Sequence, residues 1–384
     1  MEKDLSVYEL LKSVSRTTLN SEGVNYIRSC VMSKESFWRY IYQKAELEGV
    51  SGLLYSHLAN LKLLNFTPDR FQEKITKKYK LILRKNMDNL LCLINLEKKL
   101  SENNVQVIVL QGFSLLHYYR DPGLRPMSDI DILVKPRHKQ TILGFLKSDG
   151  FYSPFPGNPD LVIKKDIIVD IHTHPLNIDR IKARRYIFPE EISGLWQRAL
   201  PVNKSQSLFV MDIYDSFLCL SAHALKHCYG RLIWLCDLNE QLNVLLQNKN
   251  GWNSLIMRAE SCGQKRILLY TLMILELTHN IKIPSRVKKR LNFQRMNIIE
   301  NRIIKLISKG IALKTAFIIL SLFNIKGSLN KILYIKESVF PRKKIMARMA
   351  HVRPVKLKIK DYYKRMQYVQ RTAGKDLVKL LFGE

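Results

Sequence analysis

Two aspartates that stand one residue apart, Asp129 and Asp131, lie in the aliphatic run SDIDILV (128–134). Side chains alternate along a strand, so both carboxylates would share one face while Ile130 and Ile132 occupy the other. Their Cα atoms would be roughly 6.6 Å apart, which lets the carboxylates share one divalent cation or bridge two in a phosphoryl-transfer site. Oxygen ligands suit Mg²⁺ or Mn²⁺. Taken alone, the pair also fits two solvated aspartates at a sheet edge.

The neighbouring segments favour the metal interpretation. VIVLQGFS (107–114) reads as a strand, a glycine turn and a helix start. Gly112 would let backbone N–H groups face an anion, and the Ser114 hydroxyl would add a donor. Further on, LVIKKDIIVDIHTH (161–174) predicts two short strands or one bent strand, and it places Asp170 on a strand. The order is therefore a phosphate-type turn followed by three strand carboxylates.

This order resembles the nucleotidyltransferase (DNA polymerase β-like) superfamily. That pattern has a glycine turn, a short helix, paired carboxylates and a third carboxylate on a later strand. More closely, the chain is similar to a bacterial family described as uncharacterised nucleotidyltransferase. The segments that carry this likeness are VIVLQGFSLL, DPGLRPMSDIDILV and VDIHTH. A looser likeness extends over about residues 35–370.

The resemblance implies an α+β fold, in which a small mixed-sheet nucleotidyltransferase core is flanked by N- and C-terminal helical regions. It also implies an enzyme that moves a nucleoside monophosphate from an NTP to a hydroxyl or phosphate acceptor and releases pyrophosphate. Asp129 and Asp131 would hold the catalytic Mg²⁺ or Mn²⁺. Asp170 would ligate one metal and help to deprotonate the acceptor. Gly112, Ser114 and Ser128 would bind the nucleotide.

The chain departs from the family at Gln111, where a lysine usually precedes the glycine. Glutamine donates a hydrogen bond but carries no charge, so another cation would have to neutralise the triphosphate. Arg125 and Lys226 are the candidates. Arg125 fits two interpretations, contact with a phosphate or an ion pair with Asp129.

Histidines near these aspartates have several interpretations. His172 alternates with Asp170 and fits either a metal ligand or, preferably, a partner that orients Asp170. His174 precedes a proline, and we expect no role for it. His223 and His227 have the i, i+4 spacing of zinc helices, but the glutamate of that motif is absent, so zinc is not favoured.

Two residues of the next helical segment are also candidates with alternatives. Trp234 fits a base-stacking residue or a core residue, and Asp237 fits a carboxylate without chemistry. The sequence contains no Walker A motif, no G-x-G-x-x-G motif and no G-x-S-x-G elbow. A P-loop kinase, a dinucleotide-dependent dehydrogenase and an α/β-hydrolase are therefore disfavoured.

The chain of 384 residues, with 46% hydrophobic and 25% charged residues, has a globular composition. Periodicity predicts four parts, listed in chain order: a helical region (1–100), the α+β core (101–200), a second helical region (201–330) and a basic tail packed on or near the core (331–384). In the amphipathic segment 71–100, the expected core face carries Leu83, Met87, Leu90, Leu91 and Ile94, widened by Leu93, Leu96 and Leu100.

Charge is concentrated at the C-terminal end. The net charge is +30, and residues 281–384, with 26 Lys/Arg and 5 Asp/Glu, carry +21 of it. This tail favours a polyanionic partner, although a genomic bias toward lysine also produces such tails. The open alternatives are a nucleotidyltransferase acting on RNA such as tRNA ends, and a non-catalytic protein that binds nucleotides or a membrane surface. A small molecule or glycan precursor is the favoured acceptor, and peripheral contact with an anionic membrane is a further expectation.

The remaining features concern location. The N-terminus lacks an apolar h-region, and the apolar run 315–325 is too short for a transmembrane span. The six cysteines form no C-x-x-C motif, which favours reduced thiols. We therefore expect a cytoplasmic protein without a transmembrane segment.

Overall fold

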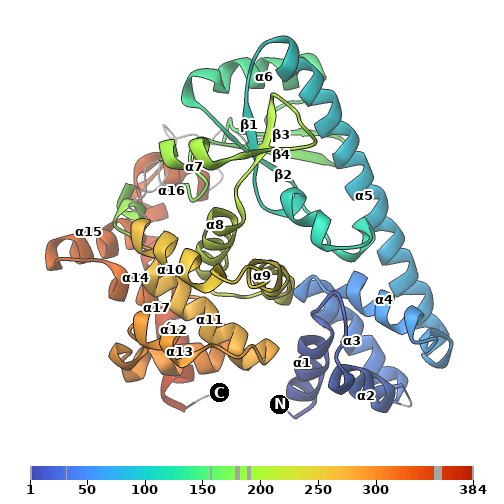
Figure 1. Cartoon of the computed structure of the whole chain (residues 1–384). Coiled ribbons are helices and arrows are strands. Elements are labelled where there is room, and N and C mark those ends of the chain that lie inside the picture. Colours follow the sequence, from blue (N-terminus) through green and yellow to red (C-terminus); the bar gives the residue numbers. More distant parts are fainter. Residues whose placement is uncertain are drawn as a thin grey trace.

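The computed structural model describes residues 2–31, 33–155, 158–177, 182–187, 192–349 and 357–382. A six-stranded sheet in the order β3-β4-β2-β1-β6-β5 lies among the helices (Figure 1). Its strands are β1 (Val107–Val109), β2 (Ile130–Val134), β3 (Leu161–Lys164), β4 (Ile167–His172), β5 (Leu200–Pro201) and β6 (Leu208–Val210). The pairs β2–β4 and β1–β6 are parallel and the other neighbours are antiparallel. This mixed sheet with helical flanks confirms the predicted α+β fold.

The strands form where β-branched residues cluster between turns. The segment 161–174 makes two strands, and the turn between them holds Lys165 at a φ of 53°. The sheet also continues past residue 200, because β6 pairs with β1 and β5 pairs with β6. Strand residues therefore reach into the segment from which the sequence predicts only helices.

Helices cover both faces of the sheet. One face packs on α5 (Asp69–Glu102) and α6 (Lys139–Ser148), and Ile130 and Ile132 lie in that core with Leu96 of α5. The opposite face turns toward the C-terminal helices and contributes Ile108 and Leu133 to the larger core. The alternation along β2 therefore directs Asp131, between Ile130 and Ile132, toward the C-terminal helices.

The N-terminal helices are α1 (Glu2–Val14), α2 (Ser21–Cys30), α3 (Glu35–Glu48) and α4 (Ser51–Asn60), and a long α5 follows them. The predicted face of α5 is wrong in part, because Met87, Leu91 and Ile94 are exposed. The buried face carries Asn86 and Asn89 instead. Asn86 donates to the backbone oxygens of Pro122 (2.7 Å) and Arg125 (2.8 Å), so a loop from another part of the chain makes its burial favourable.

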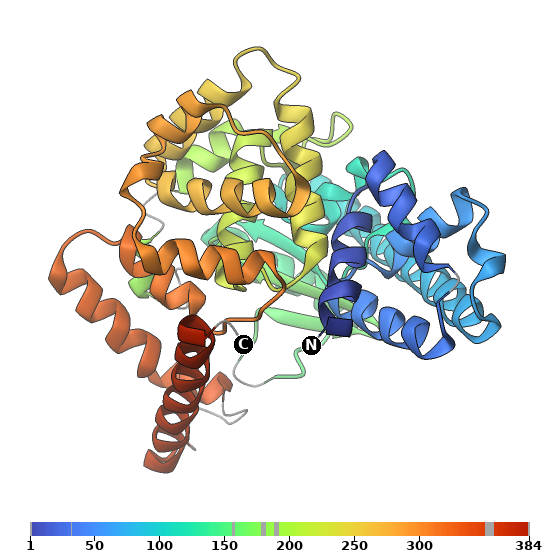
Figure 2. The same cartoon turned by 90° about the horizontal axis from the view of Figure 1, so that it is seen from below.

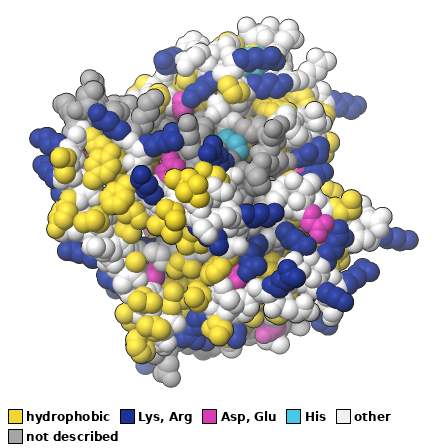
Figure 3. Space-filling model, turned by 90° about the vertical axis from the view of Figure 1, so that its left-hand side faces the viewer, with side chains coloured by type: hydrophobic (Ala, Val, Ile, Leu, Met, Phe, Trp, Pro, Cys, Tyr) yellow, Lys and Arg dark blue, Asp and Glu magenta, His cyan; other side chains and the backbone are white. Residues whose placement is uncertain are grey.

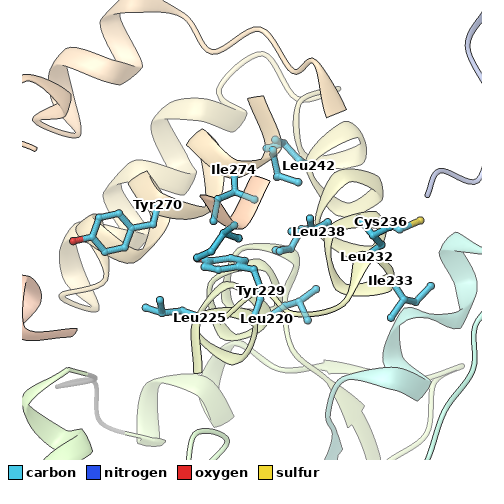
Figure 4. Packing of buried hydrophobic residues seen from close by; sticks show 14 of the residues in the cluster. Leu220, Leu225, Tyr229, Leu232, Ile233, Cys236, Leu238, Leu242, Tyr270 and Ile274 are labelled. Carbon is cyan, nitrogen blue, oxygen red and sulfur yellow. The ribbon is translucent and has the colours of Figure 1, made fainter. Parts of the chain in front are cut away.

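The C-terminal helices form the other half of the molecule. They are α7 (Ile192–Arg198), α8 (Ile213–Lys226), α9 (Leu232–Leu245), α10 (Gly251–Ser261), α11 (Lys265–His279), α12 (Ser285–Arg290), α13 (Ile298–Ser308) and α14 (Ala316–Asn324). Leu225 of α8, Leu238 of α9 and Ile274 of α11 belong to one buried cluster (Figure 4). This packing fixes α8 and α9 below the sheet, where they face its aspartates.

The last helices are α15 (Ser328–Val339), α16 (Lys343–Met349) and α17 (Ile359–Phe382). α17 packs against α13 and α15 and projects beyond the other helices (Figure 2). Over the described residues, none of the helices has the length and apolar content needed to cross a membrane.

Candidate active site

A cavity of about 390 Å³ separates the sheet from α8 and α9. The sheet side carries Asp129, Asp131, Asp170 and His172. The helix side is lined by residues of α8 and of the start of α9: His223, Lys226, His227, Arg231, Ile233 and Trp234. An acidic wall therefore faces a wall that is basic and aromatic.

The acidic wall follows from strand register. Asp131 of β2 pairs with Asp170 of the parallel strand β4, so the two carboxylates lie side by side on one face. Asp170 is 8% exposed. Ligand atoms of Asp131, Asp170 and His172 lie within 4.8 Å of one another. Two adjacent carboxylates at this depth repel each other unless a cation or protons compensate them.

Asp129 lies just before β2 and lines the same cavity as Asp131. Burial, and then the negative charges of Asp131 and Asp170, raise the pKa of Asp129. The Ser128 hydroxyl donates to Asp129 Oδ1 at 2.6 Å and opposes this rise. Ser128 thus contacts a carboxylate, and it also lines the cavity into which the sequence places a nucleotide.

His172 contacts both strand aspartates. Its Nε2 is 2.7 Å from Asp131 Oδ1 and 3.5 Å from Asp170 Oδ2, so it lies closer to Asp131 than the sequence interpretation suggests. Its Nδ1 is 3.0 Å from Asn177 Oδ1. Asn177 also lines the cavity and was not among the predicted residues. His174 lies outside the cavity lining, and its Nδ1 accepts from Leu176 N at 3.1 Å.

The glycine turn lies next to the acidic wall. Gly112 lines the cavity with a φ of +57° and begins the 3-10 helix η2 (Gly112–Tyr118). That backbone conformation favours glycine. Gln111 also lines the cavity, whereas Ser114 lines a separate small crevice with residues such as Ser216 of α8. In a 3-10 helix, residues three positions apart share a face. Ser114 is only two positions after Gly112, so it does not face the same side as Gly112.

On the helix wall, three aromatic rings pack together. The ring of Trp234 is 5.3 Å from that of His223 and 5.2 Å from that of His227. The Arg231 guanidinium lies 5.7 Å from the Trp234 ring. Burial and the neighbouring Lys226 lower the pKa of His223 well below its usual range, so it is uncharged at neutral pH. The positive charge of this wall therefore comes from Lys226 and Arg231.

Arg125 lines the cavity, and it pairs with Asp237 of α9 and not with Asp129. Its Nε and Nη2 donate to the two Asp237 oxygens at 2.8 and 2.7 Å, and the Tyr119 hydroxyl donates to Asp237 at 2.6 Å. The side chains of Arg125 and Asp237 are 6% and 0% exposed. Nη1 lies beside Gly112, 3.5 Å from the position a Cβ would take there. Of the two interpretations of Arg125, the pairing with Asp129 is therefore wrong, because a buried ion pair joins the loop that carries Arg125 to α9.

Comparison with known proteins gives one match. A family model described as "Uncharacterised nucleotidyltransferase" matches residues 34–280, which is more than half of the chain. The match covers α3 to α11, and with them all the residues that line the cavity. No curated protein and no solved structure matches this chain.

Proposed function

Since the chain belongs to the uncharacterised nucleotidyltransferase family, we propose that it transfers a nucleoside monophosphate from an NTP to an acceptor. The observation that carries the proposal is the pairing of Asp131 with Asp170 across β2 and β4, with Asp129 beside them and Lys226 and Arg231 on the opposite wall. Carboxylates that hold metal and cations that hold phosphates are the two groups this reaction needs.

The residues fit a divalent cation. Asp131 and Asp170 offer hard oxygen donors in the cluster that they form with His172. Asp129 lies close enough for the charges of these two carboxylates to raise its pKa, and a cation would relieve this repulsion. Mg²⁺ or Mn²⁺ held by these three aspartates would neutralise charge on the transferred phosphate and lower the pKa of the attacking hydroxyl. His172, through Asp131 and Asn177, keeps the aspartate side chains in place.

The NTP phosphates would lie between the two walls. Backbone N–H groups at the Gly112 turn would donate to phosphate oxygens. Lys226, Arg231 and the Nη1 side of Arg125 would supply the positive charge that Gln111 lacks. Trp234 offers a ring on the same wall for the nucleoside.

The reaction is a displacement at the α-phosphorus. The acceptor oxygen forms a bond to this phosphorus while the bond to the bridging oxygen of the β-phosphate breaks, and pyrophosphate leaves. Asp170, the most buried of the three aspartates, is the residue we propose to receive the acceptor proton. Asp129 and Asp131 would hold the metal.

The acceptor we propose is a small molecule or glycan precursor. The cavity of about 390 Å³ has the dimensions of a small-molecule site and would hold the NTP, with the acceptor entering beside Asp170. Since an NTP is the proposed donor, we also propose a cytoplasmic location.

Label transfer tests the proposal. The protein is incubated with each α-labelled NTP, Mg²⁺ or Mn²⁺, and a cell extract divided into RNA, protein and small-molecule fractions. We expect label in the small-molecule fraction, lost in Asp131→Asn and retained in Asp166→Asn, a matched control on the exposed β3–β4 turn. Equal transfer by Asp131→Asn and the native chain would refute the assigned role of the carboxylates. Label in the RNA fraction would refute the small acceptor.

A further inference from the structure

The helices at the C-terminal end expose most of their apolar side chains. Among the described residues, α15 buries only Tyr334 and α17 only Asp376. We define the tail face as the exposed apolar residues of these helices and their junction: Leu329, Ile332, Leu333, Ile335, Phe340, Ile359, Tyr363, Tyr368, Leu377, Val378, Leu381 and Phe382. Helices in proteins gain most of their stability by burying an apolar face. The exposed apolar surface of α15 and α17 therefore indicates that a partner outside the chain covers these two helices.

The attachment of α17 to the rest of the protein is largely polar. Asp376 accepts hydrogen bonds from Thr315 N (2.6 Å) and Thr315 Oγ1 (2.7 Å). Lys379 Nζ donates to Ala312 O at 2.7 Å, and Arg365 donates to Ser338 O of α15 at 3.1 Å. These contacts hold one side of the helix while Leu377 and its apolar neighbours point to solvent.

The tail face lies within a strongly basic part of the surface. The side of the molecule on which α15 lies shows apolar side chains gathered together with Lys and Arg around them (Figure 3). Among the described residues, the exposed basic ones from α15 to α17 are Lys336, Arg342, Lys343, Lys358, Lys360, Lys364, Arg371 and Lys375, and Lys326 lies just before α15. The acidic residues described from α15 to α17 are Glu337, Asp361 and the buried Asp376, and Arg342 lies 3.4 Å from Glu337. The partner must therefore be both apolar and anionic.

We propose that the tail face binds the surface of an anionic lipid bilayer. Basic amphipathic helices lie in the bilayer interface with apolar side chains in the acyl boundary and lysines near acidic headgroups. A second copy of the chain would bring another strongly basic surface against this one, which is repulsive. RNA is bound through stacked aromatic rings, whereas eight of the twelve tail-face residues, such as Ile332 and Ile335, are aliphatic. This inference does not depend on the chemistry of the cavity.

Vesicle co-sedimentation of the full chain tests the proposal. Vesicles contain either phosphatidylcholine alone or a 7:3 mixture of phosphatidylcholine and phosphatidylserine. We expect binding to the mixed vesicles that weakens as salt increases, and little binding to the neutral ones. The apolar variant Ile332→Ser/Ile335→Ser should lose at least tenfold in partitioning. The charge variant Lys336→Gln/Lys360→Gln/Lys364→Gln should lose roughly fivefold for each lysine.

The matched control removes equal charge elsewhere. Lys77, Lys80 and Lys98 are exposed on α5, which lies on the other side of the molecule (Figure 1). Lys77→Gln/Lys80→Gln/Lys98→Gln should bind mixed vesicles as the native chain does. All of these substitutions are at solvent-accessible positions, and circular dichroism and melting temperature verify folding.

Three results would overturn the proposal. The native chain would fail to sediment with mixed vesicles, or the α5 control would lose as much binding as the tail-face charge variant. The third result concerns the Ile332→Ser/Ile335→Ser variant. This variant would bind vesicles as the native chain does, and it would lose either binding to a single-stranded RNA or self-association in the absence of lipid.

Discussion

Removal of the Asp237 carboxylate should strongly destabilise the protein. Three hydrogen bonds of 2.6–2.8 Å reach this side chain, two from Arg125 and one from Tyr119. In Asp237→Ala, a guanidinium that is 6% exposed loses its partner. Breaking a buried pair in this way costs about 3–5 kcal/mol, which is a large part of the roughly 5–15 kcal/mol that stabilises a folded protein.

Equilibrium urea denaturation measures this loss as a change in the free energy of unfolding. The control is Asp88→Ala, because Asp88 lies 3.9 Å from Arg84 on the surface and its side chain is 53% exposed. We expect that control to change stability by less than about 0.5 kcal/mol. If Asp237→Ala lowered the free energy of unfolding by less than about 1 kcal/mol, the conclusion that this buried ion pair stabilises the fold would be refuted.

Replacing all three side chains with apolar ones separates the two possible origins of the lost stability, which are unpaired buried charge and lost packing volume. In Arg125→Met/Asp237→Leu/Tyr119→Phe, no charge or hydroxyl is left without a partner, so most of the lost stability should return. A triple variant that is as unstable as Asp237→Ala would show that packing volume, not unpaired charge, sets the cost. Nucleotide binding by the triple variant also measures what Arg125 contributes to the phosphates.

Other predictions follow from the cavity and the core. Mg²⁺ or Mn²⁺ should raise the melting temperature, by the equivalent of about 2.7 kcal/mol at 100 times the dissociation constant; EDTA should reverse this, and Asp131→Asn should lack it. Ser114→Ala should leave KM for NTP within about twofold, because Ser114 lies outside the cavity lining, whereas Gly112→Ala should weaken NTP binding and cost about 1 kcal/mol through its φ of +57°. Burial lowers the pKa of His279 from 6.5 to about 4. As the pH falls, His279 therefore takes up a proton in the unfolded chain before it does so in the folded protein. The protein then has its full stability above pH 6.5, and the free energy of unfolding should fall by up to about 3 kcal/mol as the pH drops toward 4. Urea midpoints at several pH values measure this fall, and equal midpoints at pH 7.5 and pH 5 would contradict it. A melting temperature that does not respond to metal would contradict the metal prediction, and an unchanged KM in Gly112→Ala would contradict the glycine prediction.

The features that the sequence predicts well are local. The alternation of Asp129 and Asp131 with Ile130 and Ile132 depends on the strand period alone, and the structure places the aliphatic pair in the core beneath α5. The positions of β1 to β4 follow equally from β-branched runs between polar turns, whereas β5 and β6 lie where the sequence predicts no strand. The basic tail is visible as composition, because charge can be counted without knowing the fold.

Features that depend on distant partners could not be predicted in this way. Arg125 and Asp237 are 112 residues apart, and no local pattern connects them. Asn86 is buried because it binds the backbone of the loop that carries Arg125, so hydropathy selects the face of α5 wrongly in part. Asn177 lacks a motif of its own, and its place beside His172 is a product of the turn after β4.

The length of α5 has a mechanical consequence. With 34 residues, it is a rod of about 51 Å, from a rise of 1.5 Å per residue. One end is packed on α4 and the other on the sheet, so the N-terminal helices and the acidic wall are expected to move as a single rigid body. The helices of the opposite wall are attached to the same body, because Leu232 N of α9 donates to Glu48 of α3 at 3.0 Å and His279 Nε2 of α11 lies 2.9 Å from Ser15 O. The Arg125–Asp237 pair adds a further connection between the walls, so the width of the cavity is expected to change little when a nucleotide enters.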